Sequence, residues 1–520
     1  MLTKAKAVKT VSIIFVLILM AKVLGQVREM MISGYYGIGS EAATFYTASQ
    51  IPLNIFEASL GTAIACIFIP VFNEYLERDG HERAMQFSNT FINLVFVFSA
   101  VVAILGIILA SPLVSIQSPG FDAEQHVMAV NMLKIMFPMM VFTALTFSFV
   151  GILQSFHEFN VPASISLISN AITIVYFLTF NKRFGIYGLA VAVLAGWVMQ
   201  FLVLIPSLKK KQYKYRFYIN LKENGVKKVA IQALPVIISS MAQPLIVMNN
   251  IKLASYLNNG QAVPALNYAN KLYVIVVGVF SLALTNILLP YLSRLNTAKD
   301  YNGMAKMINT ALRAIVFVIF PLMVGFLIMG QPLIRLVYER GEFGFDATHL
   351  TSTALLFYSL GMVGFAVQEI LNKTFYAMQD SFTPMKISLV GIAINIGLSY
   401  LLVKPLGIGG LALAASVASI FIALALLYFI RKKVTGVVTL SMMIDTGKVL
   451  LSCCFMAAAV FFTLSVLSPI VSVNDLLGKV ILFVIPVAAG IIVYGIAVLL
   501  LKVEETNTAI KFVREKLKKG

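Results

Sequence analysis

Long, uninterrupted apolar runs dominate this sequence. Residues 11–21, 91–110 and 481–501, alone or with their flanks, are long enough to cross about 30 Å of hydrocarbon as helices. The strands of a membrane barrel would instead alternate polar and apolar residues in short segments. Because 59% of the residues are hydrophobic and 12% are charged, the composition also lies outside the usual globular range. The sequence therefore predicts an all-α polytopic membrane protein.

The apolar runs, separated by polar loops, predict about fourteen transmembrane helices. They are centred roughly on residues 20, 60, 100, 140, 170, 196, 242, 280, 319, 364, 394, 420, 457 and 490. If the N-terminus is cytoplasmic, roughly two dozen Lys and Arg residues fall inside and about five outside, so the positive-inside rule places both termini in the cytoplasm. This asymmetry explains most of the +18 net charge. Since the sequence contains no segment that resembles a folded nucleic-acid-binding domain, nucleic acid is not an expected partner.

The chain also contains an internal repeat at an offset of about 220 residues. Matching pairs are AIACIFIP at 63–70 with ALTNILLP at 283–290, GFDA at 120–123 with GFDA at 344–347, Asn89 with Asn309, Pro162 with Pro384, and Gly185 with Gly407. Each copy holds six predicted spans, an even number, so the copies should be related by an axis along the membrane normal. Two such bundles around a central site are typical of an alternating-access transporter, with a channel or a scaffold as the rival interpretation.

The repeat and the basic loops predict five segments. They are an N-terminal six-helix half at 1–208, a basic cytoplasmic linker at 209–228, a C-terminal six-helix half at 229–433, two additional transmembrane helices at 434–502 and a basic cytoplasmic tail at 503–520.

Charged side chains inside the spans are the first functional candidates. Such a side chain costs several kcal/mol at bilayer depth unless it faces a partner or a wet cavity. The first span carries Lys22, Arg28 and Glu29, and the eighth carries Lys271. On an unbroken helix Arg28 points roughly 120° away from Lys22, whereas a bend at Gly25 would bring the three charges of the first span to one cavity. A structural pairing of Arg28 and Glu29 with neighbouring helices is the alternative. The cationic excess suits phosphate oxygens.

Several motifs together resemble one known family. They are Lys22-Val-Leu-Gly-x-x-Arg-Glu29, Gly37-x-Gly39, Ile51-Pro52, Phe68-Ile-Pro-Val-Phe-x-Glu74, SPGF at 118–121, YANKL at 268–272, ILLP at 287–290 and FYAMQDSFTP at 375–384. In this combination the chain resembles the MurJ (MviN) family of lipid II flippases, within the superfamily of multidrug, oligosaccharidyl-lipid and polysaccharide exporters. The resemblance covers essentially the whole chain, including the two extra C-terminal helices.

The resemblance implies a cargo and a site. Members move undecaprenyl-diphosphate-linked peptidoglycan precursor across the bacterial cytoplasmic membrane for cell wall biogenesis and cell shape, which makes this anionic lipid-linked glycan, membrane lipids and the cell-wall synthesis machinery the expected partners. It implies transport without catalytic residues, cofactors or metals, driven by the membrane potential or a cation gradient. The substrate-binding residues that it implies are Lys22, Arg28, Glu29, Asn270 and Lys271, and the candidates for a cation or gating site are Asn250, Gln379, Asp380 and Glu57.

The sequence also departs from the family pattern. Phe56 replaces a second-span arginine, Ala43 with Glu41 nearby replaces an acid of the first loop, and Val274 replaces an acid after the eighth-span cation. Asn250 stands where some members have an aspartate. These departures keep open a flippase for another polyprenyl-diphosphate-linked oligosaccharide, such as a capsule or exopolysaccharide unit. A cation-coupled drug exporter would need an acidic cavity, and a membrane enzyme would need a His or paired-carboxylate set that the short loops lack.

Overall fold

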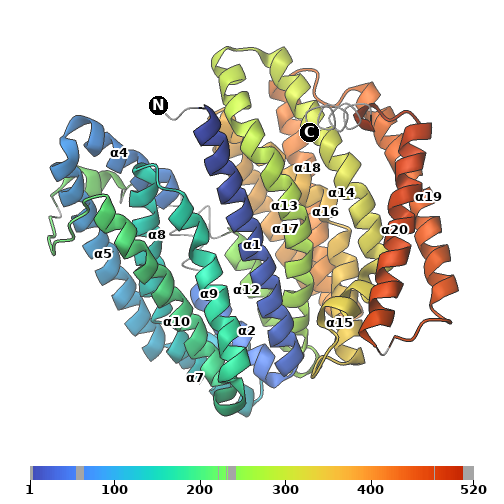
Figure 1. Cartoon of the computed structure of the whole chain (residues 1–520), viewed down its shortest axis with the longest axis horizontal. Coiled ribbons are helices and arrows are strands. Elements are labelled where there is room, and N and C mark those ends of the chain that lie inside the picture. Colours follow the sequence, from blue (N-terminus) through green and yellow to red (C-terminus); the bar gives the residue numbers. More distant parts are fainter. Residues whose placement is uncertain are drawn as a thin grey trace. The chain divides into compact units, whose positions relative to one another are not determined.

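The structure is a computed structural model, and every segment with regular structure in the part that it describes is helical. The described residues are 4–53, 64–220, 222–229, 231, 242–473 and 475–506. The chain divides into two compact units, Met1–Pro264 and Ala265–Gly520 (Figure 1). Phe56, Glu57 and most of the predicted cytoplasmic tail lie outside the described residues.

Nine described helices are long and apolar enough to cross a membrane. They are α5 (Gly80–Ile108), α7 with α8 (Ala123–Met136 and Met139–Ser155), α9 (Asn160–Thr179), α10 (Asn181–Lys210), α14 (Tyr301–Tyr338), α17 (Phe382–Leu406), α18 (Ile408–Lys433), α19 (Leu440–Leu467) and α20 (Leu476–Leu500). A tenth arises if α15 (Phe345–Ser359) and α16 (Met362–Ala377), bent by 49° at their junction, form one broken span. The full set of fourteen stays a prediction, because the other expected spans include residues or side chains outside the description.

The first unit has an aromatic core. Besides α5 and α7 to α10 it contains α1 (Lys4–Tyr36), α2 (Ser40–Pro52), the π-helical turn η2 (Ile64–Phe68), α4 (Ile69–Arg78), α6 (Ala110–Gln117) and α12 (Ala242–Ser255). Phe68 and Phe72 are fully buried, and the ring centroids of Phe68 and Phe91 lie 4.4 Å apart. The motif at residues 68–74 therefore supplies core packing between α4, α5 and α8.

Residues 118–121 connect α2 and α12 within the first unit. The hydroxyls of Thr47 and Ser118 are 3.1 Å apart, and the Gly120 amide donates to the Ser255 hydroxyl at 3.1 Å. A Cβ on Gly120 would lie only 2.5 Å from the Ser255 carbonyl oxygen, so this close approach requires glycine. Although α12 belongs to the second copy of the repeat, it thus packs in the first unit. The predicted segment boundaries follow sequence duplication and stay a prediction.

The second unit begins within α13 (Ala262–Thr297) and ends with the two additional helices. These helices, α19 and α20, lie beside α14 (Figure 1). Tyr494 on α20 donates to the Phe317 carbonyl of α14 at 2.7 Å. Toward the start of α14, the Arg313 guanidinium lies 3.2 Å from the Asp445 carboxylate of α19. Hydrogen bonds and ion pairs therefore fasten both additional helices to α14.

Residues matched by the sequence repeat make matching contacts inside each unit. Gly185, near the start of α10, has a φ of 52°, and Gly407, between α17 and α18, has a φ of 53°. The side-chain amide of Asn89 donates to the Lys214 carbonyl at 3.1 Å, while that of Asn309 donates to the Gly436 carbonyl at 2.8 Å. The repeat thus reflects duplicated local structure. Its expected axis along the membrane normal stays a prediction.

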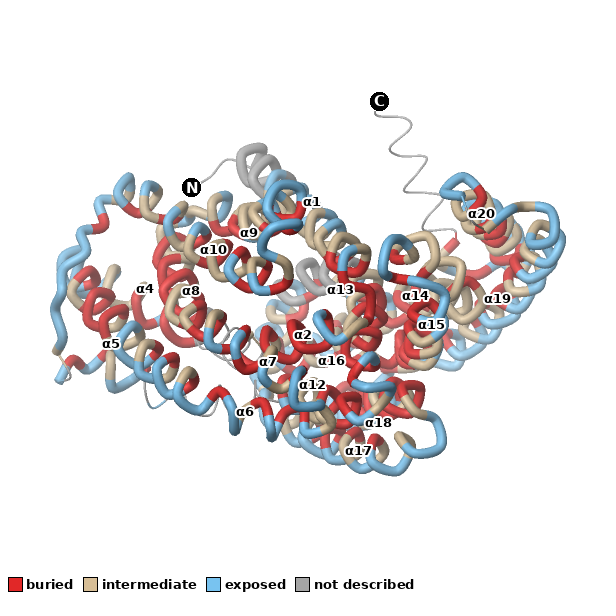
Figure 2. Tube along the Cα trace, turned by 90° about the horizontal axis from the view of Figure 1, so that it is seen from below, coloured by how far each residue is buried: buried red, intermediate tan, exposed pale blue. Residues whose placement is uncertain are grey.

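Burial follows the helix faces expected for a bilayer. Buried residues lie between neighbouring helices, and exposed residues lie on the outer faces of elements such as α19 and α20 (Figure 2). Those outer faces are apolar, with Phe461 and Phe462 exposing 68% and 70% of their surface. Apolar faces of this kind avoid water when lipid covers them.

Candidate functional site

The charged residues of α1 form a network with two neighbouring helices. The Arg28 guanidinium donates from Nη2 to Oε1 of Glu29 at 2.8 Å and from Nη1 to Oδ1 of Asn170 on α9 at 3.0 Å. The Tyr46 hydroxyl of α2 donates to the other Glu29 oxygen at 2.6 Å. The predicted pairing of Arg28 and Glu29 with neighbouring helices is therefore present.

Glu29 and Arg28 differ in how far their side chains are exposed. The Glu29 side chain is 3% exposed and the Arg28 side chain is 30% exposed. A buried carboxylate is strongly unfavourable unless it is paired and hydrogen-bonded, and here both of its oxygens accept hydrogen bonds. Glu29 and Asn170 together orient the Arg28 guanidinium, which remains within reach of a ligand.

Gly25 provides the room that Asn170 needs. The Asn170 amide donates to the Ala21 carbonyl at 3.1 Å, and a Cβ on Gly25 would lie 3.5 Å from the same nitrogen. The helix α1 continues through Gly25 from Lys4 to Tyr36. A side chain larger than a methyl group at position 25 would displace Asn170 and with it one support of Arg28.

Lys22 lies on the same helix and is half-buried. In the part of the chain that the structure describes, it has no hydrogen bond or ion pair to Arg28 or Glu29. Its convergence with those residues on one cavity stays a prediction.

The candidates of the second unit lie on α13. Asn270 and Lys271 are both half-buried. The ring of Tyr273, two residues after Lys271 on α13, stacks on the ring of Tyr358 on α15, with centroids 5.7 Å apart. This aromatic contact packs the turn of α13 that carries Lys271 against α15.

Asn250 has the environment of an incomplete polar site. It lies on α12 and is 7% exposed. Its Oδ1 is buried and has no hydrogen-bond partner among the residues that the structure describes. A buried acceptor without a hydrogen-bond partner costs about 1–3 kcal/mol of folding free energy. A water molecule or a cation at Oδ1 would remove this cost.

Gln379 and Asp380 form the turn between α16 and α17. Gln379 is exposed with a φ of 59°. Asp380 accepts from the Thr383 amide at 3.0 Å and from its hydroxyl at 2.6 Å, and it is ion-paired with Lys433. Burial raises the pKa of Asp380, but the bonds from Lys433 and Thr383 outweigh burial and lower this pKa to about 2. In this structure Asp380 joins the start of α17 to the end of α18.

Two members of the α1 network were not predicted from the sequence. Asn170 and Tyr46 are uncharged and lie outside the family motifs. The available signal was an amide in an otherwise apolar span, because polar side chains in such spans usually have a partner. A single sequence does not show which residue is the partner of Asn170 or of Tyr46.

The comparison with protein families is decisive. A sequence profile described as "Lipid II flippase MurJ" matches residues 32–482. The chain belongs to the MurJ family of lipid II flippases. The lipid II flippase MurJ of Burkholderia cenocepacia is 30% identical over 80% of this chain and 82% of its own length. The probable lipid II flippase MurJ of Rickettsia prowazekii is 28% identical over 84% and 86%, respectively.

Solved structures agree with the MurJ fold. A structure of lipid II flippase MurJ in an inward closed conformation superposes with a TM-score of 0.80 at 22% identity, covering 93% of this chain and 97% of that one. An inward-facing multidrug resistance transporter of the MATE family gives a TM-score of 0.69 at 14% identity, over 80% and 94%. At these identities the likeness shows the fold alone. Family membership confirms the resemblance found in the sequence and places the chain among multi-pass membrane transporters and not among enzymes.

Proposed function

We propose that this protein moves lipid II, the undecaprenyl-diphosphate-linked peptidoglycan precursor, from the inner to the outer leaflet of the bacterial cytoplasmic membrane. The proposal rests chiefly on the position, hydrogen bonds and exposure of Arg28. Arg28 lies in an apolar helix, two neighbours hold its guanidinium, and 30% of its side chain stays exposed. A guanidinium presents a rigid fork of donors that matches phosphate oxygens, and ordering it beforehand reduces the entropy lost on binding.

The residues that we propose for the cargo diphosphate are Arg28, with Lys22 and Lys271 as point charges and Asn270 as an amide donor. Glu29 orients Arg28 and also cancels one positive charge. The attraction is then moderate, and a transporter must release its cargo as well as bind it. In an alternating-access cycle of the two six-helix halves, the bound diphosphate would be exposed to each leaflet in turn.

The energy source that we propose is the membrane potential or a cation gradient. An inside-negative potential favours outward movement of an anion by about 2.3 kcal/mol per charge and 100 mV. The buried Oδ1 of Asn250, which has no partner in the described part of the chain, supports a role in cation binding. Gln379, Asp380 and Glu57 remain the other candidates for cation binding or gating.

The proposal includes a topology of fourteen spans with both termini in the cytoplasm, as the basic loops indicate. It also includes the cell-wall synthesis machinery as a partner, because the product of this transport is a substrate for polymerisation outside the membrane.

One observation favours a second cargo. Phe56 and Val274 replace charged residues of the family pattern, so fewer charges are available to bind a diphosphate and the sugars attached to it. Another polyprenyl-diphosphate-linked oligosaccharide, of a capsule or an exopolysaccharide, is therefore the alternative cargo.

Complementation separates the two cargoes. The full chain is expressed in a bacterium depleted of its own lipid II flippase and, separately, in one that lacks its capsule flippase. We expect rescue of growth in the first strain and no capsule in the second. Lysis of the first strain, with the protein present in its membrane and capsule restored in the second, would overturn lipid II as the cargo.

A further inference from the structure

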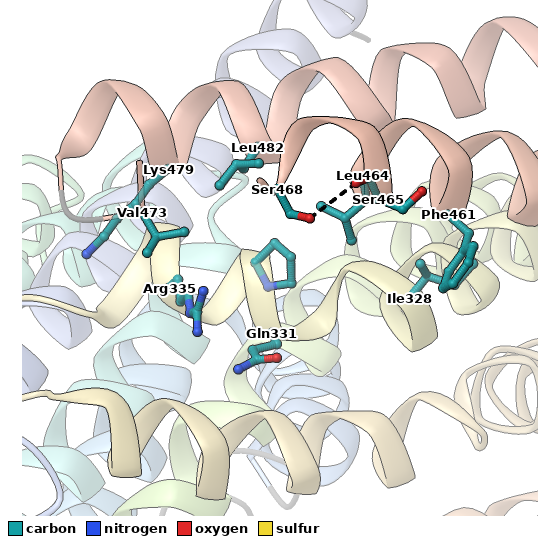
Figure 3. A pocket seen from close by; sticks show the side chains of 11 residues that line it. Ile328, Gln331, Arg335, Phe461, Leu464, Ser465, Ser468, Val473, Lys479 and Leu482 are labelled. Carbon is teal, nitrogen blue, oxygen red and sulfur yellow. Dashed lines mark hydrogen bonds between the residues drawn. The ribbon is translucent and has the colours of Figure 1, made fainter. Parts of the chain in front are cut away.

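A pocket of about 360 Å³ lies between α14, α19 and α20, inside the second unit. Its lining changes character along its length (Figure 3). Arg335 and Lys479 lie at one end, and Ile328 and Phe461 lie at the other. The pocket therefore has a cationic end and an apolar end.

The cations at the first end are held in place. Lys479 donates to the Glu339 carbonyl at 2.9 Å, and its ammonium lies 3.2 Å from the Glu339 carboxylate. Arg335 Nε lies 3.6 Å from the same carboxylate, which is beyond hydrogen-bonding distance. Glu339 is fixed in turn by the Thr348 hydroxyl at 2.7 Å. One acid thus orients two cations and leaves a net charge of about +1.

Arg335 lacks a full set of acceptors in this arrangement. Its Nε is buried and has no hydrogen-bond partner among the described residues. Its guanidinium carbon lies 5.5 Å from the centre of the Phe345 ring, which fixes the plane of the group without satisfying its donors. Although the buried Nε itself is out of reach of a ligand, an anion in the pocket would pair with the charge of the guanidinium.

The long axis of the pocket follows the helices. Arg335 is close to the end of α14 at Tyr338, and Ile328 lies seven residues deeper, about 10 Å along the helix. Beside the apolar end, Phe461 is 68% exposed. In a membrane that α14 spans, the cationic end would lie at the depth of lipid headgroups and the apolar end at the depth of acyl chains.

We propose that this pocket binds the phosphate of a membrane phospholipid, with an acyl chain directed toward Phe461. A phosphodiester carries one negative charge, which matches the net charge of the Arg335, Lys479 and Glu339 group. The volume lies at the lower end of the range for small-molecule sites, which is enough for a headgroup and the start of a chain. A lipid bound here would fasten α19 and α20 to α14.

The test uses native mass spectrometry of the full-length protein in detergent, titrated with phosphatidylglycerol or phosphatidylcholine. We expect Arg335→Gln and Lys479→Gln each to weaken the tightest phosphatidylglycerol binding roughly tenfold, since each removes a charge-assisted hydrogen bond. The matched control is Arg340→Gln, which removes a charge from the same helix end but outside the pocket lining; there we expect unchanged binding.

Two further arms separate a lipid from a free ion. Phe461→Ala should weaken phosphatidylglycerol binding while leaving any thermal stabilisation by inorganic phosphate unchanged. If Arg335→Gln fails to fold, phosphatidylglycerol binding is measured instead with Arg335→Lys, which keeps the charge. Equal phosphatidylglycerol affinity in the unaltered protein, Arg335→Gln and Lys479→Gln would overturn the proposal. Stabilisation by inorganic phosphate without tight lipid binding would overturn the lipid as occupant.

Discussion

Tyr46 donates a hydrogen bond of 2.6 Å to Glu29, a carboxylate that is almost fully buried. The bond ties α2 to α1 at the residue that also orients Arg28. Glu29 therefore acts as a support, because its own surface is too small to meet a ligand. Arg28 is the member of the network that a ligand can reach.

Tyr46→Phe removes one of the two hydrogen bonds that the Glu29 carboxylate accepts from side chains in the described part of the chain. We expect it to lower the unfolding free energy by roughly 1–3 kcal/mol, because the buried carboxylate loses a donor. The measurement is the melting temperature of the purified protein. The control is Tyr35→Phe, since Tyr35 is 41% exposed and lies on α1, the helix of Glu29. Equal melting temperatures for the two variants would show that the bond contributes nothing.

The nine or ten spans found among the described residues were predictable from the sequence, and the side-chain contacts between their helices were not. Apolar runs of sufficient length identify helices such as α5 and α14 because hydrocarbon excludes unpaired backbone groups. The charges of α1 were also identified from the sequence, because an ionisable group at that depth needs a partner. Their partners Asn170 and Tyr46 come from other helices, and only the packing of α1 against α2 and α9 selects them.

The two matched glycines should be equally sensitive to substitution. Gly185 (φ 52°, ψ −147°) and Gly407 (φ 53°, ψ −128°) occupy a backbone region that other residues rarely adopt, so Gly185→Ala and Gly407→Ala should each cost roughly 1–3 kcal/mol. Nothing lies within 4 Å of an added Cβ at either site, so crowding is not the reason. Gly397→Ala, also in open space but inside α17, should instead stabilise by roughly 0.5–1 kcal/mol, because alanine is the better helix former. Unchanged melting of the first two variants would contradict the shared strain.

Asp380 should make stability depend on pH in the acid range. Its pKa in the folded protein is about 2, below the ordinary value of about 3.9, so its bonds stabilise the fold above pH 4 and are lost as the pH falls toward 2. We expect Asp380→Asn to melt lower than the unaltered protein at pH 7 and the difference to shrink by pH 3. A difference that is constant between these pH values would refute the assignment.

The orientation predicts which loops are accessible from outside the cell. In a background without Cys66, Cys453 and Cys454, Lys210→Cys in the basic linker should resist an impermeant thiol reagent in intact cells. Glu342→Cys, in the connection between α14 and α15, should react. Labelling of Lys210→Cys with protection of Glu342→Cys would reverse the orientation.

The packing of α12 and the pocket beside α14 also could not be predicted from the sequence. The repeat assigns α12 to the second copy, whereas Gly120 allows it to pack beside residues 118–121 of the first unit. Arg335 and Lys479 lie far apart in the sequence, near the ends of different helices, where a charge is ordinarily explained by snorkelling. Only the fold brings both to Glu339.

Rescue of growth in cells depleted of their lipid II flippase tests the central claim most directly when Arg28 and Lys271 are varied. Arg28→Ala should abolish rescue, Arg28→Lys should restore part of it because lysine keeps the charge without the fork, and Lys271→Arg should rescue fully. Membrane levels of each variant, measured in the same cells, separate lost transport from lost protein. Full rescue by the combined Arg28→Ala and Lys271→Ala variant, at normal membrane level, would contradict phosphate binding by these cations.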